Sequence, residues 1–223
     1  PRQVGRDALP IMPSIDLPSR SCRQSIRPPD HAVSWSMTTN VHFDFIASVY
    51  DRAIGAPDPG RLQAALALPT AGWLLDAGGG TGRVAAQLRP LVGRLVISDL
   101  SAPMLAQAQE KGIACPVQTH VERLPFPDGH FDRVLAVDAL HHFADQRLAV
   151  AELARVLKPG GRLVIEEPDI ARFPVKLMAL AEKLALMGSH FHSPQQISYL
   201  MAANGLDSTI EQDGLTAWVI ADK

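Results

Sequence analysis

Short apolar runs alternate with amphipathic segments along most of this chain, and the two patterns predict different elements. Apolar runs bounded by turn-forming residues predict buried strands over residues 73–77, 94–98, 116–121, 131–137 and 162–167. Apolar positions at helical spacing predict helices over residues 61–68, 82–91, 101–111, 145–157, 175–187 and 194–204. Strands that alternate with helices in this way indicate a parallel sheet covered on both faces.

Individual helices carry signals for their ends and their buried faces. Ser101 is a suitable N-cap for the helix at 101–111, and Gly112 is a suitable stop. In the helix at 145–157, we expect Leu148, Leu153 and Leu157 to face the core.

The end of the chain predicts a change from parallel to antiparallel pairing. Residues 207–212 and 215–221 flank Asp213-Gly214, a strong signal for a two-residue hairpin turn. The predicted fold is therefore α/β, Rossmann-like and doubly wound, with a mostly parallel seven-stranded sheet and a C-terminal antiparallel β-hairpin. Sheets of this type bind ligands at the carboxyl ends of their strands, near the switch in strand order.

Residues 1–36 show neither the helical spacing of apolar residues nor the alternation of a strand, and they contain six of the 18 prolines. Proline removes backbone donors and fixes φ, so we expect a disordered N-terminal extension here. A processed targeting peptide is the alternative, and Met37 is the expected natural start. A single domain is predicted over residues 37–223, beginning with an amphipathic helix at 44–54.

Composition narrows the function classes. The net charge of −2 gives no support for nucleic-acid binding, which usually shows a basic excess. No apolar run reaches the roughly 20 residues of a membrane helix. Two cysteines exclude a disulfide scaffold, and with no export signal the cytoplasm is the expected compartment.

A glycine-rich loop follows the first predicted strand, at Asp76-Ala77-Gly78-Gly79-Gly80-Thr81-Gly82. Glycines let the backbone turn sharply and approach a ligand, although a tight turn without a ligand is the simpler alternative. Asp99 ends the second strand, where a carboxylate accepts hydrogen bonds from ribose hydroxyls. Asp76 would repel a pyrophosphate, which disfavours a nicotinamide-dependent oxidoreductase. A ligand with a ribose and a cationic amino group is favoured, as in S-adenosylmethionine.

Four motifs in this order resemble those of the class I S-adenosylmethionine-dependent methyltransferases. Residues 76–82 resemble the D-x-G-x-G-x-G loop, and Asp99 matches the acid of the second motif. Residues 124–132, L-P-F-P-D-G-H-F-D, and residues 155–161, R-V-L-K-P-G-G, resemble the subgroup of ubiquinone/menaquinone C-methyltransferases. The resemblance implies this family's fold and S-adenosylmethionine as cofactor.

The resemblance also implies a set of cofactor-binding residues. Asp76 would orient the amino group of the methionine part, Asp99 the ribose diol, and Tyr50 the methionine end from the helix at 44–54. The full set is Tyr50, Asp76, Gly78, Gly79, Gly80, Gly82, Asp99, Leu100, Met104, His120, Val121, Glu122 and Asp138.

The adenine end of this set departs from the family pattern. Thr119, His120 and Val121 stand where many relatives have glycine, aspartate and alanine. The neutral ring of His120 can accept from the adenine amino group, and the backbone of Val121 offers an N–H. Glu122 is the nearest carboxylate. Leu100 and Met104 are expected to pack on the adenine or to belong to the core.

Candidate acceptor-side residues follow the fourth and fifth strands. His141 and His142 follow the fourth strand, and the segment 166–194 contains Glu166, Glu167, His190 and His192 among other polar residues. Each of the four histidines is a candidate base for an acceptor that loses a proton, or a residue that only shapes the pocket. His190-x-His192 has a spacing that suits metal, but no third ligand lies nearby in the sequence, so no metal is predicted.

The sequence therefore predicts methyl transfer from S-adenosylmethionine to a small, partly apolar molecule, at carbon, oxygen or nitrogen. The alternative is a non-catalytic S-adenosylmethionine-binding partner or regulatory module. Oligomeric state is not predicted.

Overall fold

A computed structural model describes residues 57–113, 115–184 and 189–223 of the chain. They form one seven-stranded sheet with the order β3-β2-β1-β4-β5-β7-β6. The strands are β1 (Thr70–Ala77), β2 (Val92–Asp99), β3 (Pro116–Gln118), β4 (Phe131–Val137), β5 (Leu157–Pro168), β6 (Asp207–Asp213) and β7 (Thr216–Asp222). The expected N-terminal extension and the predicted helix at 44–54 lie outside the described residues.

The first five strands pair in parallel, and the last two form an antiparallel hairpin against β5. This confirms the predicted fold class. The strand order reverses at β1, which lies between β2 and β4. The loops after β1, β2 and β4 therefore meet at one edge of the sheet, the usual ligand position in open α/β sheets.

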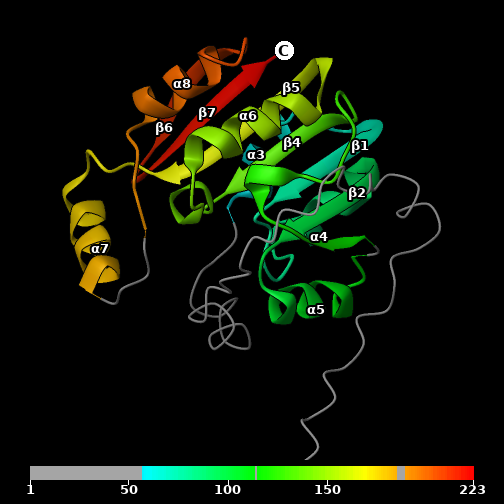
Figure 1. Cartoon of the computed structure of the whole chain (residues 1–223), viewed down its shortest axis with the longest axis horizontal. Helices are drawn as coiled ribbons and strands as arrows, with labels where there is room; N and C mark the ends of the chain where they lie inside the picture. The colour runs from blue at the N-terminus through cyan, green and yellow to red at the C-terminus, as the bar shows by residue number, and fades with distance from the viewer. Residues whose placement is uncertain (1–56, 114, 185–188) are drawn as a thin grey trace, which may run out of the picture.

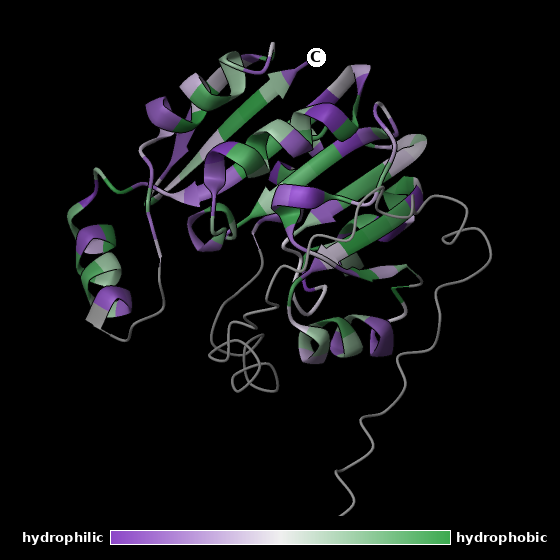
Figure 2. Cartoon of the chain, viewed as in Figure 1, coloured by the Kyte–Doolittle hydropathy of each residue, from purple (hydrophilic) through white to green (hydrophobic). Residues whose placement is uncertain are grey.

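Helices cover both faces of the sheet (Figure 1). They are α3 (Pro59–Ala65), α4 (Ala85–Leu88), α5 (Ala102–Glu110), α6 (Gln146–Val156), α7 (Phe173–Leu184) and α8 (Pro194–Ala202), with 3-10 turns η1 (Arg89–Leu91), η2 (Val121–Arg123) and η3 (Leu140–His142). Side chains of α6 and α8 pack in one core cluster with Leu75, and side chains of α3 and α4 pack in another with Leu74. These strand neighbours point to opposite faces, so β1 is buried on both sides, and the centre of the sheet is hydrophobic (Figure 2).

Helix α7 differs from the other helices. It stands off from the sheet beyond the end of β5 (Figure 1). Of the α7 side chains that the structure describes, Val175 is buried, whereas Phe173, Leu177 and Leu180 are each more than half exposed. No helix in the described part of the chain is both long and apolar enough to cross a membrane.

Backbone geometry corrects two predicted boundaries. The helix predicted over 82–91 begins at Ala85, because Gly82 has φ +74° and such a residue cannot belong to a right-handed helix. The hairpin turn lies at Gly214-Leu215, one residue later than predicted, because Asp213 still pairs with Thr216.

Two further predictions were wrong in detail. The expected turn at 158–161 is a bulge inside β5, where these residues lie opposite Asp132 alone. Leu148 is 52% exposed rather than buried. It lies five residues before Leu153, which is about 140° around a helix, so the two cannot share one narrow core face. Leu153 is fully buried as expected, and Leu157 is fully buried as the first residue of β5 rather than in the helix.

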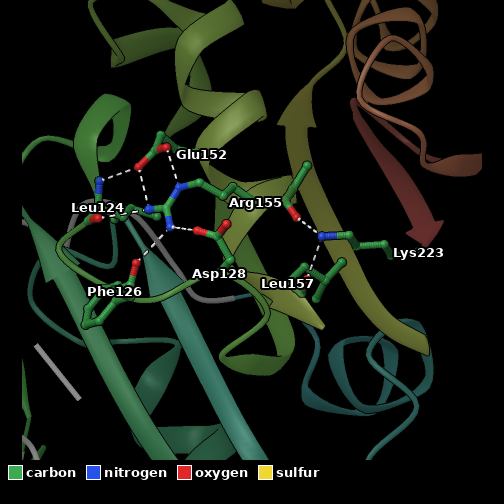
Figure 3. Close-up of polar contacts among 8 residues, drawn as sticks. Leu124, Phe126, Asp128, Glu152, Arg155, Leu157 and Lys223 are labelled. Atoms are coloured by element: carbon green, nitrogen blue, oxygen red, sulfur yellow. Dashed lines mark hydrogen bonds and ion pairs between the residues drawn. The ribbon is translucent and has the colours of Figure 1, made fainter. Parts of the chain in front are cut away.

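Arg155 joins the two motifs that resemble the C-methyltransferase subgroup (Figure 3). Its guanidinium donates to the carbonyl oxygens of Phe126 at 2.8 Å and Leu124 at 3.0 Å, and to the carboxylates of Glu152 and Asp128. The loop at 124–128 lacks regular pairing of its own, so Arg155 supplies the partners for its carbonyl groups. This arginine has a structural role away from the carboxyl ends of the strands.

Candidate functional site

The glycine loop after β1 is the first part of the site. Gly78, Gly80 and Gly82 have φ values of +71°, +55° and +74°, a region that favours glycine. The N–H groups of Gly78 and Gly79 donate to the carbonyl oxygen of Ser98 at the end of β2. A Cβ at Gly78 would lie 2.8 Å from the Cβ of Ala139 in the loop after β4. Glycine is therefore required for the close approach of these two loops.

Asp99 closes the loop against β2. One carboxylate oxygen accepts from the N–H of Gly80 at 2.9 Å, and the other accepts from the N–H of Ser101 at 2.8 Å. Ser101 is also the N-cap of α5, as predicted. Each carboxylate oxygen has further acceptor capacity. Asp99 can therefore hold the loop and still accept from a diol.

Asp76 is a buried carboxylate whose charge is only partly compensated: the backbone N–H of Ala85 donates to it, and Arg83 lies nearby. Its side chain is 1% exposed, and among the described residues its Oδ2 atom has no hydrogen-bond partner. Burial raises the pKa of Asp76 from 3.8 to about 7, while nearby Arg83 opposes this rise and Asp99 adds to it. A buried carboxylate in this state favours the arrival of a cationic group.

The predicted adenine-side residues lie beside the loop. Met104 is buried, with its sulfur facing Gly80, and Leu100 is half-buried. His120 and Val121 follow β3, and among the described residues the Nε2 atom of His120 is buried without a partner. Glu122 accepts from the backbone N–H of Asp145 at the start of α6.

Asp138 follows β4 on the other side of the loop. It has φ +52°, unusual for a residue other than glycine, and its carboxylate lies 3.6 Å from the guanidinium of Arg83. Burial raises its pKa to about 6, with His141 opposing the rise. Arg83 therefore acts on both Asp138 and Asp76, because it lowers the pKa of each carboxyl group.

His141 and Glu167 form a buried pair at the carboxyl ends of β4 and β5. The Nδ1 atom of His141 lies 2.5 Å from Oε2 of Glu167. The other oxygen of Glu167 accepts from the backbone N–H groups of Ala139 and Leu140. Burial lowers the pKa of His141, but the charge and hydrogen bond of Glu167 together raise this pKa by more than burial lowers it. The net shift is therefore upward. Glu167 therefore fixes the ring through Nδ1.

Sequence reasoning placed Glu167 among the polar residues after the fifth strand but gave it no role. The signal that could have indicated its role was the predicted order of the strands. In a parallel sheet the end of β5 lies beside the end of β4, so an acid there faces the residues that follow β4.

His142 packs against His141, with ring centroids 3.9 Å apart, and Phe191 stacks on His141 with ring centroids 4.3 Å apart. Burial, with a smaller contribution from His141, lowers the pKa of His142 to about 3. Its Nδ1 atom lies 3.2 Å from the hydroxyl of Ser189. This ring is a neutral one in a largely buried cluster.

The other two candidate histidines lie in the segment that follows α7. His190 is exposed, and its backbone N–H donates to the carbonyl oxygen of His141. His192 is half-buried, and burial lowers its pKa. The structure thus brings this segment against His141 through its backbone. Tyr50 lies outside the described residues.

Comparisons with known proteins identify the family. The methyltransferase domain family matches residues 75–165. The YcgJ protein from Bacillus subtilis, known from its crystal structure, is 30% identical over 69% of this chain and 70% of that chain, with a TM-score of 0.61. The chain belongs to the S-adenosylmethionine-dependent methyltransferases. S-adenosylmethionine is thus the cofactor, as Asp76 before the glycine loop led us to predict.

Further similarities agree with this family of methyltransferases. The ubiquinone/menaquinone biosynthesis C-methyltransferase UbiE of Pseudomonas fluorescens is 40% identical over 104 residues, which is 42% of this chain and 41% of that protein. The chain thus matches less than half the length of this curated relative. A methyltransferase from Thermotoga maritima, described as a possible histamine N-methyltransferase, shares the fold at a TM-score of 0.68 and 22% identity, over 84% of this chain and 100% of that one.

Proposed function

We propose that this protein transfers the methyl group of S-adenosylmethionine to a small, partly apolar molecule through a hydroxyl group that loses its proton. The oxygen itself, or an aromatic carbon conjugated with it, attacks the methyl carbon. The carbon–sulfur bond breaks, the sulfur keeps the electron pair, and S-adenosylhomocysteine is left. The observation that carries this proposal is the His141–Glu167 pair at the carboxyl ends of β4 and β5.

The cofactor's orientation follows from the charges around the glycine loop. Its ammonium group would offset the buried charge of Asp76, and its ribose diol would donate to Asp99. Gly78 and Gly80 would leave room for the methionine part, and the adenine would lie toward Met104 and the unpartnered Nε2 of His120. This orientation directs the sulfonium toward the loop after β4.

The acceptor side combines apolar surface with one polar cluster. Phe143 lies against Gly78, and Phe191 stacks on His141. These rings suit a flat, partly apolar molecule. The name of the relative from Pseudomonas fluorescens places that protein in ubiquinone/menaquinone biosynthesis as a C-methyltransferase, which supports an acceptor of this character.

A deprotonation step explains why so polar a pair is buried here. A sulfonium is already activated, so alignment alone suffices for an acceptor that is already nucleophilic. A hydroxyl group needs to lose its proton, and a positioned histidine is the usual side chain for that task. The Glu167 carboxylate holds the His141 ring so that Nε2 faces away from Glu167.

The test is a methylation assay with a panel of hydroxylated aromatic and aliphatic molecules, each paired with its methyl ether. Mass spectrometry detects both the methylated product and S-adenosylhomocysteine. We expect turnover of hydroxyl compounds and none of the ethers. If no member of the panel is methylated, the non-catalytic S-adenosylmethionine-binding module becomes the better account.

A substitution at His141 tests the pair itself. In His141→Asn, the amide N–H can replace the Nδ1–H donor to Glu167, but nothing replaces Nε2. We expect kcat to fall about 10²- to 10⁴-fold with unchanged affinity for S-adenosylhomocysteine. His130→Asn removes a half-buried histidine just before β4, at the opposite end of that strand, and should keep kcat within about twofold.

A further inference from the structure

A second set of side chains meets at the acceptor end of the site. His141 and His142 from η3 and Glu182 from α7 each bring one possible ligand atom to within 4.8 Å of the others. Sequence reasoning singled out His190 and His192 for their spacing, found no third ligand nearby, and predicted no metal. Glu182 comes from a different element, so its approach to the histidines was not readable from spacing.

In each histidine of this set, the Nδ1 atom has a polar partner. Glu167 holds Nδ1 of His141, and the hydroxyl of Ser189 lies 3.2 Å from Nδ1 of His142. Ligating histidines in proteins commonly have their second ring nitrogen fixed by a carboxylate or another polar group, which sets the tautomer and raises the basicity of the ligating nitrogen. The outer partners of a metal site are therefore already in place.

Glu182 supplies the third donor. Among the described residues its Oε2 atom is buried without a hydrogen-bond partner, although the side chain belongs to an otherwise exposed helix. A buried, unpaired carboxylate oxygen is costly unless a cation offsets it. Asp138 lies near enough to Glu167 and Glu182 to be affected by both charges, so negative charge accumulates at this end of the sheet.

We propose that His141, His142 and Glu182 bind one divalent transition-metal ion of the zinc class. Two imidazoles and one glutamate are a known catalytic donor set for zinc, and they leave a coordination position open. Zinc ligands lie about 2.0–2.2 Å from the ion, so the three donors draw together by roughly 1 Å on binding. Because α7 buries little of its own surface, a small shift of this helix is cheap.

The open position takes the hydroxyl oxygen of the acceptor, and this step rests on the proposed function. Coordination lowers the pKa of the hydroxyl, and its proton leaves to solvent. The oxygen, or a carbon conjugated with it, then attacks the methyl carbon while the carbon–sulfur bond breaks. In this arrangement His141 acts as a ligand rather than as the base.

Binding is tested on the full chain without an affinity tag, after removal of metals with a chelator. Co²⁺ is titrated first because its visible spectrum reports coordination, and Zn²⁺ is then titrated by calorimetry. We expect one ion per chain. Glu182→Gln and His142→Asn should each weaken binding about 100-fold. The controls Glu110→Gln on α5 and His130→Asn should stay within about twofold of the wild type.

The inference is overturned if no Zn²⁺ binds at a concentration of about 1 mM. An equal loss in the controls also overturns it. If the metal-free protein keeps full activity while His141→Asn loses it, activation of the acceptor by the metal is wrong and the proposed function stands, with His141 as the base. If Zn²⁺ binds as described but no acceptor is methylated, the proposed function is wrong and the metal site stands.

Discussion

Replacing the buried Asp76 by asparagine should change stability and cofactor binding in opposite directions. The substitution keeps the shape of the side chain and an oxygen that can accept from the N–H of Ala85. It removes the negative charge, which has no hydrogen-bond partner at Oδ2 among the described residues. Without cofactor that charge costs free energy, whereas in the proposed complex it pairs with the ammonium group of the cofactor.

The magnitude follows from the pKa of Asp76. Burial raises it from 3.8 to about 7. The folded protein therefore keeps a proton that the unfolded chain loses, and the free energy of unfolding falls as the pH rises from about 4 to about 7. The shift corresponds to at most about 4 kcal/mol. We expect Asp76→Asn to stabilise the cofactor-free protein by about 1–4 kcal/mol at pH 8, and to change little at pH 4.

Cofactor affinity should move the other way. Loss of a charge-assisted hydrogen bond costs about 1.5–3 kcal/mol, so S-adenosylhomocysteine should bind Asp76→Asn about 10- to 150-fold more weakly at pH 8. In the wild type, affinity should fall up to about tenfold for each pH unit below 7, as Asp76 takes up its proton. This dependence should be much weaker in Asp76→Asn.

Urea unfolding of the cofactor-free protein and calorimetric titration with S-adenosylhomocysteine, both between pH 5 and 8, measure the two effects. Methylthioadenosine is the control ligand, because it lacks the amino acid part with its α-amino group and should bind both proteins equally. The reasoning is refuted if Asp76→Asn is less stable than the wild type at pH 8. It is also refuted if the two proteins share one pH profile for S-adenosylhomocysteine.

Three further substitutions test individual contacts. Asp99→Ala should weaken the binding of S-adenosylhomocysteine about 10- to 100-fold by calorimetry, because it removes the carboxylate that we propose accepts from the ribose. Unchanged affinity would remove Asp99 from the site. Gly82→Ala should lower the urea midpoint more than Gly112→Ala, because both have positive φ but a Cβ at Gly82 lies 3.0 Å from a neighbouring side chain, whereas one at Gly112 meets open space; equal losses would contradict the packing argument. Arg155→Leu should cost about 2–4 kcal/mol of unfolding free energy, because buried carbonyl groups lose their donor, and the exposed Arg147→Leu should cost less than about 0.5. Equal costs would show that the network in Figure 3 is not stabilising.

The architecture was predictable because strand and helix periods were clear. Phe131–Val137 forms β4 over the predicted residues, and the helix after Ser101 has the predicted cap. The errors arose where a single residue's conformation or position sets the start of an element or the face that it buries. Gly82 delays the start of α4, and Leu148 lies on the wrong side of α6 for the core.

The placement of Asp76 and Asp99 beside the glycine loop was predictable from local sequence, because both lie at the ends of adjacent strands, whereas their roles toward the cofactor stay predictions. The acceptor side was not predictable in this way, because its contacts join distant segments. Glu167 reaches His141 through the pairing of β4 and β5, and Glu182 reaches it through the placement of α7. Neither contact leaves a signal in residue spacing.

A crystal structure of the protein with S-adenosylhomocysteine tests the central claim most directly. We predict that the ligand's amino group lies against Asp76, its ribose against Asp99, and its sulfur toward His141. A ligand bound at the glycine loop with its sulfur turned away from His141, or bound elsewhere on the protein, would contradict the assignment of one site to both donor and acceptor.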